Sequence, residues 1–178
     1  SDALAQQKLE MEEAFADGGE HVAKRARLDL SHTRLDDAAD LDVAESALRD
    51  APQRLSAAKF FFAQLQVSGV QRLAPHLSTH ALLDLSLARN RGIGVAGIAA
   101  LAPHLPRTLR RLNLCNTAMG VRGAAALAPH LPRGLRELLL ARNDIRDEGF
   151  ECIMRSALER GWGRGLREMD VRENRITS

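Results

Sequence analysis

Residues 82–140 read LLDLSLARNRGIGVAGIAALAPHLPRT from Leu82, LRRLNLCNTAMGVRGAAALAPHLPRG from Leu109, and LRELLL from Leu135. The second segment repeats the first with few changes, and the third segment begins in the same way. Self-similarity at a fixed spacing of 20 to 50 residues indicates a stacked repeat architecture. This near-duplication therefore sets the reading frame for the rest of the chain.

Two signatures extend the frame over most of the sequence. The first is an apolar strand pattern that ends at a turn position, and these positions are 30, 27, 27, 26 and 31 residues apart. They are Thr33, Ala63, Asn90, Thr117, Asn143 and Asn174. The second is an apolar triplet at i, i+3 and i+7, which places three side chains on one helix face. The triplets are Leu41/Ala44/Leu48, Val70/Leu73/Leu77, Ile98/Leu101/Leu105, Ala124/Leu127/Leu131 and Phe150/Ile153/Ala157, and Gly69, Gly97, Gly123 and Gly149 precede the last four.

Each repeat unit is thus predicted to be a short strand, a turn, a helix and a return loop. Leucines of the strand and of the helix meet in a wedge that one unit cannot bury alone. Stacking aligns the strands into a parallel sheet on the inner side and packs the helices on the outer side. We expect an α/β solenoid of about six repeats, with its core between sheet and helices.

The pattern LxxLxLxxN followed by a helix resembles the leucine-rich repeat, and the period near 28 residues resembles the ribonuclease-inhibitor-like subclass. The resemblance covers residues 25–178. It implies that Asn90, Asn143 and Asn174 form a ladder of side-chain hydrogen bonds to neighbouring turns. Thr33 and Thr117 are polar substitutes in this ladder. Ala63 cannot take part, so the resemblance also implies irregular geometry in the second repeat.

The two ends of the chain depart from the repeat. Leu4, Met11 and Phe15 recur at near-helical spacing before Gly18-Gly19, which predicts an acidic helix within residues 1–24. Such a helix caps the first repeat or docks a partner, and both readings stay open. The sequence stops four residues after Asn174 without a closing helix. We therefore expect either a fragment of a longer protein or a subunit whose last strand is covered by another chain.

Prolines recur inside the LAPHL segments, at Pro75, Pro103 and Pro129. Because proline interrupts a helix, the three helices are expected to end or kink there after about two turns.

Composition restricts the class of protein. Residues 1–50 carry 6 Lys and Arg against 13 Asp and Glu, whereas residues 51–178 carry 19 against 10. The two cysteines, Cys115 and Cys152, lie inside repeats and form no disulfide framework. No apolar run is long enough for a signal peptide or a membrane span. These features predict a soluble intracellular protein, cytoplasmic in location, with no membrane partner.

Two apparent motifs are better explained as copied scaffold. Gly92-x-Gly94-x-x-Gly97 has the spacing of a dinucleotide-binding loop, but the neighbouring repeats keep only its last glycine. His76, His104 and His130 recur one unit apart, about 10 Å, which is too far to share a metal ion. No catalytic arrangement can be assembled, so we expect no enzyme activity, no cofactor, no metal and no small-molecule substrate.

The inner strand face is the predicted binding surface. Side chains between the core leucines point away from the helices because successive strand residues alternate. One column along this face is small and apolar for most of its length, which suggests a shallow trough for a partner's helix or loop. The predicted partner-binding residues are Phe61, Ser86, Ala88, Asn113, Cys115, Leu139, Ala141 and Arg172.

Arginines form two basic rims beside this face. The predicted rim residues are Arg89, Arg91, Arg110, Arg136, Arg142 and Arg167. Stacked arginines favour a partner that is acidic in part, or phosphate groups. The sequence thus predicts a non-enzymatic protein-interaction module. Two alternatives stay open: a subunit of a ribonucleoprotein or other large assembly held by the arginines, and, by resemblance alone, a regulator that activates Ran-type GTPases.

Overall fold

The computed structural model of the protein describes residues 8–15, 21–51 and 55–177. The strands are β1 Lys8–Phe15, β2 His21–Asp29, β3 Leu55–Lys59, β4 Asp84–Ser86, β5 Arg111–Asn113, β6 Glu137–Leu139 and β7 Glu168–Asp170. The helices are α1 Ala38–Arg49, α2 Val67–Leu77, α3 Gly94–Leu101, α4 Gly120–Leu127 and α5 Arg146–Arg160. Short 3-10 helices follow α3, α4 and α5 at Ala102–His104, Ala128–His130 and Trp162–Gly165.

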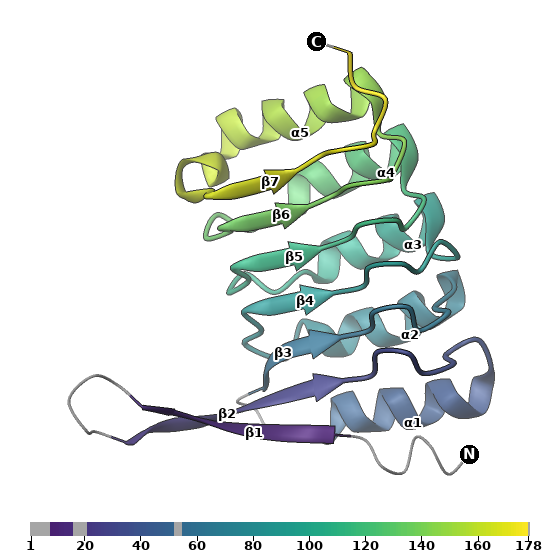
Figure 1. Ribbon diagram of the computed structural model, residues 1–178, viewed down its shortest axis with the longest axis vertical. Helices are drawn as coiled ribbons and strands as arrows, with labels where there is room; N and C mark the ends of the chain where they lie inside the picture. The colour runs from purple at the N-terminus through teal and green to yellow at the C-terminus, as the bar shows by residue number, and fades with distance from the viewer. Residues whose placement is uncertain (1–7, 16–20, 52–54, 178) are drawn as a thin grey trace.

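All strands belong to one open sheet in the order of the sequence, from β1 to β7. Strands β2 to β7 are parallel, and each helix packs against the helix of the next unit (Figure 1). This arrangement confirms the expected α/β solenoid of six strand-bearing units. Because parallel neighbours are one unit apart, equivalent residues lie side by side along the sheet.

The helix expected within residues 1–24 is wrong over residues 8–15, which form strand β1. This strand pairs antiparallel with β2, for example Leu9 opposite Leu28 and Met11 opposite Ala26. Leu9 and Met11 also fit a period of two, so the short apolar pattern did not distinguish a helix from a strand. Strand β3 covers only one edge of β2. The other edge offers backbone hydrogen bonds to residues 8–15, and these bonds favour a strand there. The turn expected at Gly18-Gly19 lies outside the described residues.

The core lies between the sheet and the helices, as the two signatures predicted. The strand leucines from Leu55 to Leu140 that face the helices are fully buried, and so are the members of the first four helical triplets. Within the last triplet, Ile153 and Ala157 are buried, whereas Phe150 is only partly buried. The core is therefore continuous through five units and becomes less covered in the sixth.

Each recurring glycine lies against the side chain of the residue four positions earlier in the chain. A Cβ atom at Gly97 would come within 2.6 Å of Ile93, and one at Gly123 within 2.8 Å of Met119. At Gly149 a Cβ would lie 3.1 Å from Ala124 of the previous helix. A side chain at Gly97 or Gly123 would force the residue four positions earlier to shift, and one at Gly149 would press against the previous helix.

The hydrogen-bond ladder is present at the turn positions. Asn90 Oδ1 accepts from the backbone N–H groups of Ala63 and Leu65, at 2.9 and 3.1 Å, and its Nδ2 donates to carbonyls of both units. Asn143 and Asn174 repeat the arrangement, and the hydroxyl of Thr117 joins it by donating to Asn143 Oδ1. Each asparagine thus ties its own turn to the turn of the preceding unit.

The irregularity implied for the second repeat is limited to one border. Strand β3 pairs with β4 in continuous register, whereas its register with β2 shifts between Ala26 and Arg27. The proline expectation holds for α3 and α4, which have 8 residues each and continue as 3-10 helices. Helix α2 does not end at Pro75 and continues to Leu77, because a proline in the last turn removes few helical hydrogen bonds.

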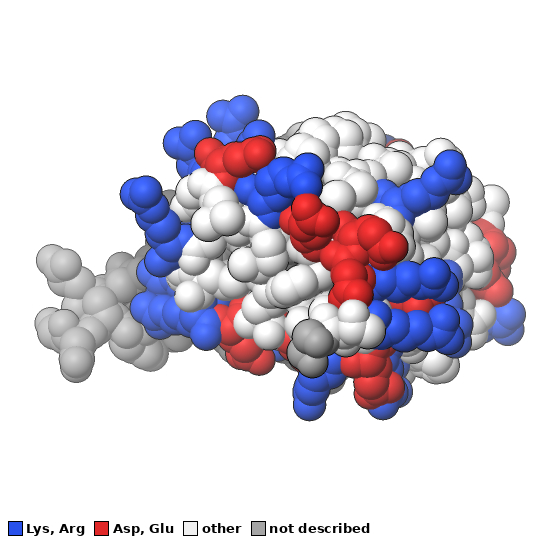
Figure 2. All heavy atoms as spheres, turned by 90° about the horizontal axis from the view of Figure 1, so that it is seen from above, with Lys and Arg blue, Asp and Glu red and all other residues white. Residues whose placement is uncertain are grey.

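The last unit is the least covered part of the array. Leu166, Met169, Val171 and Ile176 are only partly buried, although they occupy the positions of fully buried residues in the preceding units. Seen from this end, uncharged surface lies between groups of basic and acidic residues (Figure 2).

Candidate functional site

The inner face carries three columns of side chains that cross the strands in register. The first runs through Ala57, Asp84, Arg111, Glu137 and Glu168, and the second through Lys59, Ser86, Asn113, Leu139 and Asp170. The third lies just beyond the strands, where backbone hydrogen bonds join successive units: Phe61, Ala88, Cys115, Ala141 and Arg172. All eight predicted partner-binding residues lie in the second and third columns.

Much of the inner face is low because several of its side chains are small or almost fully buried. Ala88, Leu139 and Ala141 are 2%, 8% and 9% exposed, so they line the floor rather than project from it. Phe61 is half-buried: its ring packs edge-on against His32 at 5.3 Å, and the Arg89 guanidinium lies 5.4 Å from the ring centroid. The third column is therefore low and has small side chains from Ala88 to Ala141, with an aromatic group, already packed, at one end.

The first column holds an ion-pair row. Arg111 Nη1 lies 2.6 Å from Glu137 Oε2, and Arg111 Nε lies 3.9 Å from Asp84 Oδ1. Burial raises the pKa of Asp84 in spite of Arg111 and Lys59, and its Oδ1 is buried without a hydrogen bond in the described part of the chain. A hollow of about 590 Å³ opens here between Asp29, Lys59, Phe61, Asp84, Ser86 and Arg111, among others.

Several predicted residues already serve the scaffold. Asn113 Oδ1 accepts from the backbone N–H of Cys115 at 3.1 Å. Arg172 donates to both carboxylate oxygens of Asp170, at 2.9 and 2.8 Å, and these bonds lower the pKa of Asp170. Burial raises the pKa of the Cys115 thiol, so the thiol stays protonated at neutral pH and is a weak nucleophile. Ser86 has no such role in the described residues, and it lies at the centre of the face.

The two basic rims lie at opposite ends of the strands. Arg110, Arg136 and Arg167 precede their strands, and their backbones are hydrogen-bonded to one another across units. At the same end Arg107 and Arg133 line a separate hollow of about 470 Å³. Arg89, Arg91 and Arg142 follow their strands, on the turn side.

The turn side also carries residues that strand alternation did not identify. One residue in every unit, directly before the turn position, has a left-handed backbone with φ between 51° and 63°. We call these six residues the turn row: His32, Phe62, Arg89, Asn116, Arg142 and Glu173. The backbone N–H groups of the first five donate to the next unit, at 2.8 to 3.0 Å, which holds this conformation. The signal in the sequence that could have identified these residues is their position in the repeat, one residue before each turn position.

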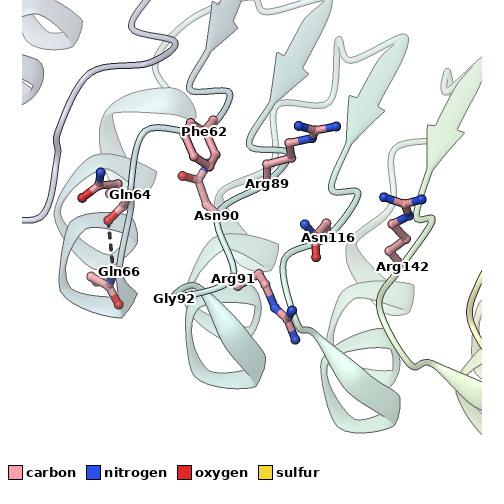
Figure 3. Close-up of a pocket in the computed structure, with 9 residues that line it drawn as sticks. All are labelled: Phe62, Gln64, Gln66, Arg89, Asn90, Arg91, Gly92, Asn116 and Arg142. Atoms are coloured by element: carbon pink, nitrogen blue, oxygen red, sulfur yellow. Dashed lines mark hydrogen bonds between the residues drawn. The ribbon is translucent and has the colours of Figure 1, made fainter.

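Part of the turn row lines a groove of about 500 Å³ (Figure 3). Phe62 is 51% exposed at one end of it, and Gln64 and Gln66 lie below. The side chains of Arg89, Asn116 and Arg142 come from three successive turns, with the two guanidinium groups extended in a similar direction and Arg91 pointing the other way. This turn groove has cationic and amide groups but no carboxylate in its lining.

Trp162 belongs to the core and not to an interface. It is fully buried, and its Nε1 donates to Ser156 Oγ at 3.2 Å. Ser156 Oγ in turn donates to the carbonyl of Ala128, at 2.6 Å. Trp162 therefore anchors the loop between α5 and β7 in the core.

Two other kinds of feature are absent from the described ranges. Within residues 8–15, 21–51 and 55–177, no group of three or more His, Cys, Asp and Glu is arranged to hold a metal ion. No helix in these ranges is long and apolar enough to cross a membrane.

Comparison with protein families gives a match to a repeat family. The family model described as leucine rich repeat matches residues 134–154, which contain β6 and the first part of α5. No curated protein matches the chain significantly. The matched segment and six parallel strands alternating with helices both support a leucine-rich repeat protein.

Proposed function

We propose that this protein is a non-enzymatic interaction module that binds a protein partner on the inner face of its solenoid. The observation that carries the proposal is the in-register column in which the small side chains of Ala88, Cys115 and Ala141 lie across successive units. A floor of small side chains admits a partner's helix or loop along its length. The partner is gripped by contact area rather than by a deep pocket.

The proposed partner is acidic in part. Lys59 and Arg111 lie within the face, and Arg89 and Arg142 stand at its turn-side border. Complementary charge accelerates association with an acidic partner, and repulsion between like charges selects against basic surfaces. The match to the leucine-rich repeat supports an interaction role, and it names no partner.

The test is affinity capture with a matched pair of variants. Ser86→Arg places a long charged side chain at the centre of the inner face, where Ser86 is only partly exposed. Ala125→Arg makes the same change on the exposed outer surface of α4. Proteins captured by the wild type and by Ala125→Arg, but lost with Ser86→Arg, are the expected result. Thermal unfolding of both variants confirms that they fold.

Loss of the same proteins in both variants, or in neither, contradicts inner-face binding. Capture is repeated at about 0.5 M salt because contacts between arginine and phosphate weaken steeply with salt. A captured set that consists of ribonucleoproteins and vanishes at high salt favours the alternative of an assembly subunit held by its arginines.

A further inference from the structure

The turn groove has an excess of positive charge that carboxylates neutralise only in part. On the outer surface, Arg72 is bonded to Asp42 and to Glu45 at 2.6 and 2.5 Å, and Glu45 also bonds to His76. In contrast, Arg89 and Arg91 have no carboxylate within ion-pair distance among the residues that the structure describes. The guanidinium of Arg89 lies 5.4 Å from the centroid of the Phe61 ring.

Two carboxylates lie beside the other end of the groove. Asp144 is paired with Arg146 and Arg175, and Glu173 is paired with Arg142. Arg142 Nε lies 2.9 Å from Glu173 Oε1, and both side chains are more than half exposed. Exposed ion pairs of this kind contribute little to stability, so an incoming carboxylate can replace Glu173. The groove therefore offers two guanidinium groups, on Arg89 and on Arg142, to an anionic ligand.

The spacing of these two groups selects the shape of the ligand. Arg89 and Arg142 belong to turns two units apart, which corresponds to about 10 Å at ordinary strand spacing. In a polyproline II segment, residues three apart lie on the same side, separated by about 9 Å. In a β-strand, residues three apart point to opposite sides, so they cannot both face the groove.

An aromatic group stands one unit before the first arginine. Phe62 is 51% exposed and shares the groove with Arg89. Exposed aromatic rings contact proline in the known modes of polyproline recognition. Asn116, between the two arginines, supplies an amide for the backbone of an extended segment, which has no internal hydrogen bonds.

From these observations we propose that the turn groove binds a proline-rich acidic segment of a protein partner, with carboxylates three residues apart on Arg89 and Arg142. The proposal rests on the proposed function, since it names a second contact with the same kind of partner. The groove lies beside the inner face. Its two guanidinium groups select the spacing of the partner's carboxylates, while the inner face supplies contact area.

The test uses a fluorescent peptide of about twelve residues made of Glu-Pro-Pro repeats, with binding followed by anisotropy. Arg89→Asn and Arg142→Asn use the residue that the turn row already has at Asn116, so the left-handed backbone is retained. Each is expected to weaken binding about tenfold, because hydrogen bonds between charged groups are strong. Glu173→Gln is expected to tighten binding because it removes the competing carboxylate.

The matched control is the double variant Arg107→Asn/Arg133→Asn, which removes two arginines from the hollow at the other end of the strands. It is expected to leave peptide binding unchanged. Equal weakening by this double variant and by Arg89→Asn/Arg142→Asn would mean general attraction of charge, and would overturn the proposal. Equal binding of a Gln-Pro-Pro peptide, or of a flexible Glu-Gly-Ser peptide, would also overturn it.

Two further outcomes separate this proposal from its alternatives. If oligothymidylate displaces the peptide at lower concentration than unlabelled peptide does, the groove prefers phosphate and the acidic segment is wrong. If Ser86→Arg loses its captured partners while Arg89→Asn/Arg142→Asn binds the peptide as the wild type does, inner-face binding stands and the turn-groove proposal falls. Peptide binding that survives in Ser86→Arg, with the expected losses in the arginine variants, supports the groove as a separate contact.

Discussion

An interior unit and the last unit of this solenoid share one sequence pattern but differ in how deeply its apolar residues are buried. In the column of strand leucines, Leu112 and Leu138 are fully buried, whereas Met169 in the same register is only partly buried. The asparagine ladder shows no such difference, because Asn143 and Asn174 are 2% and 1% exposed and make equivalent bonds. Burial of the apolar wedge thus depends on the following unit, whereas the ladder reaches back to the preceding one.

The largest expected effect concerns Trp162, which fills the connection between α5 and β7. Trp162→Ala is expected to lower the free energy of unfolding by about 3 to 5 kcal/mol, because it leaves a cavity and removes the bond to Ser156. Chemical denaturation followed by circular dichroism measures the change. Trp162→Phe is the milder companion, and an equal loss in both would show that the indole N–H, rather than the volume, matters most.

The next prediction tests the difference in apolar burial directly. Leu112→Ala is expected to cost about 2 to 5 kcal/mol of unfolding free energy, the range for fully buried leucines. Met169→Ala is expected to cost about half as much or less, because part of its surface already meets solvent. Urea denaturation of the two variants gives the comparison. Equal losses would contradict the view that the last unit lacks cover.

In the asparagine ladder, by contrast, the loss of stability should be similar in an interior unit and in the last unit. Asn143→Ala leaves the backbone N–H of Thr117 without its partner at 2.9 Å, and Asn174→Ala does the same to Asn143 at 2.8 Å. Each stranded buried group costs about 1 to 3 kcal/mol, so we expect similar losses at the two positions. A much smaller loss for Asn174→Ala, measured by the same denaturation, would mean that the last turn is already loosened.

The smallest expected effect is electrostatic. Burial raises the pKa of Asp84 above its ordinary value of 3.8, so the folded protein holds this proton more tightly than the unfolded chain. The resulting stabilisation is complete below the ordinary value and is lost as pH rises through the folded pKa. Asp84→Asn should flatten the stability profile in this acidic window. Glu168→Gln, at the exposed equivalent position in β7, is the control expected to leave the profile unchanged.

Repetition explains how much of the fold could be predicted. The positions of Leu85, Leu112 and Leu138 were readable because three copies agree, and stacking then dictates parallel register. Residues 8–15 have no copy elsewhere in the chain, and their apolar spacing suits both a helix and a strand. The pairing partner that decided the outcome, β2, is a feature of tertiary structure that local pattern does not contain.

The candidate site was predictable in outline only. Alternation placed Ser86, Cys115 and Leu139 on the inner face correctly, since it depends on strand geometry alone. It could not show that Asn113 and Arg172 are engaged by neighbouring groups, because those bonds depend on side-chain conformations. It also omitted Phe62 and Asn116, since alternation ends where the backbone becomes left-handed.

The turn row separates molecular recognition from stability. Its six residues share one backbone conformation, which main-chain hydrogen bonds hold in the first five, and five of the six side chains are exposed. Substitutions there change what the molecule presents to a partner without changing the leucine core. The row can therefore diverge one unit at a time, and grafting a different set of six side chains onto this scaffold is a direct route to new binding specificity.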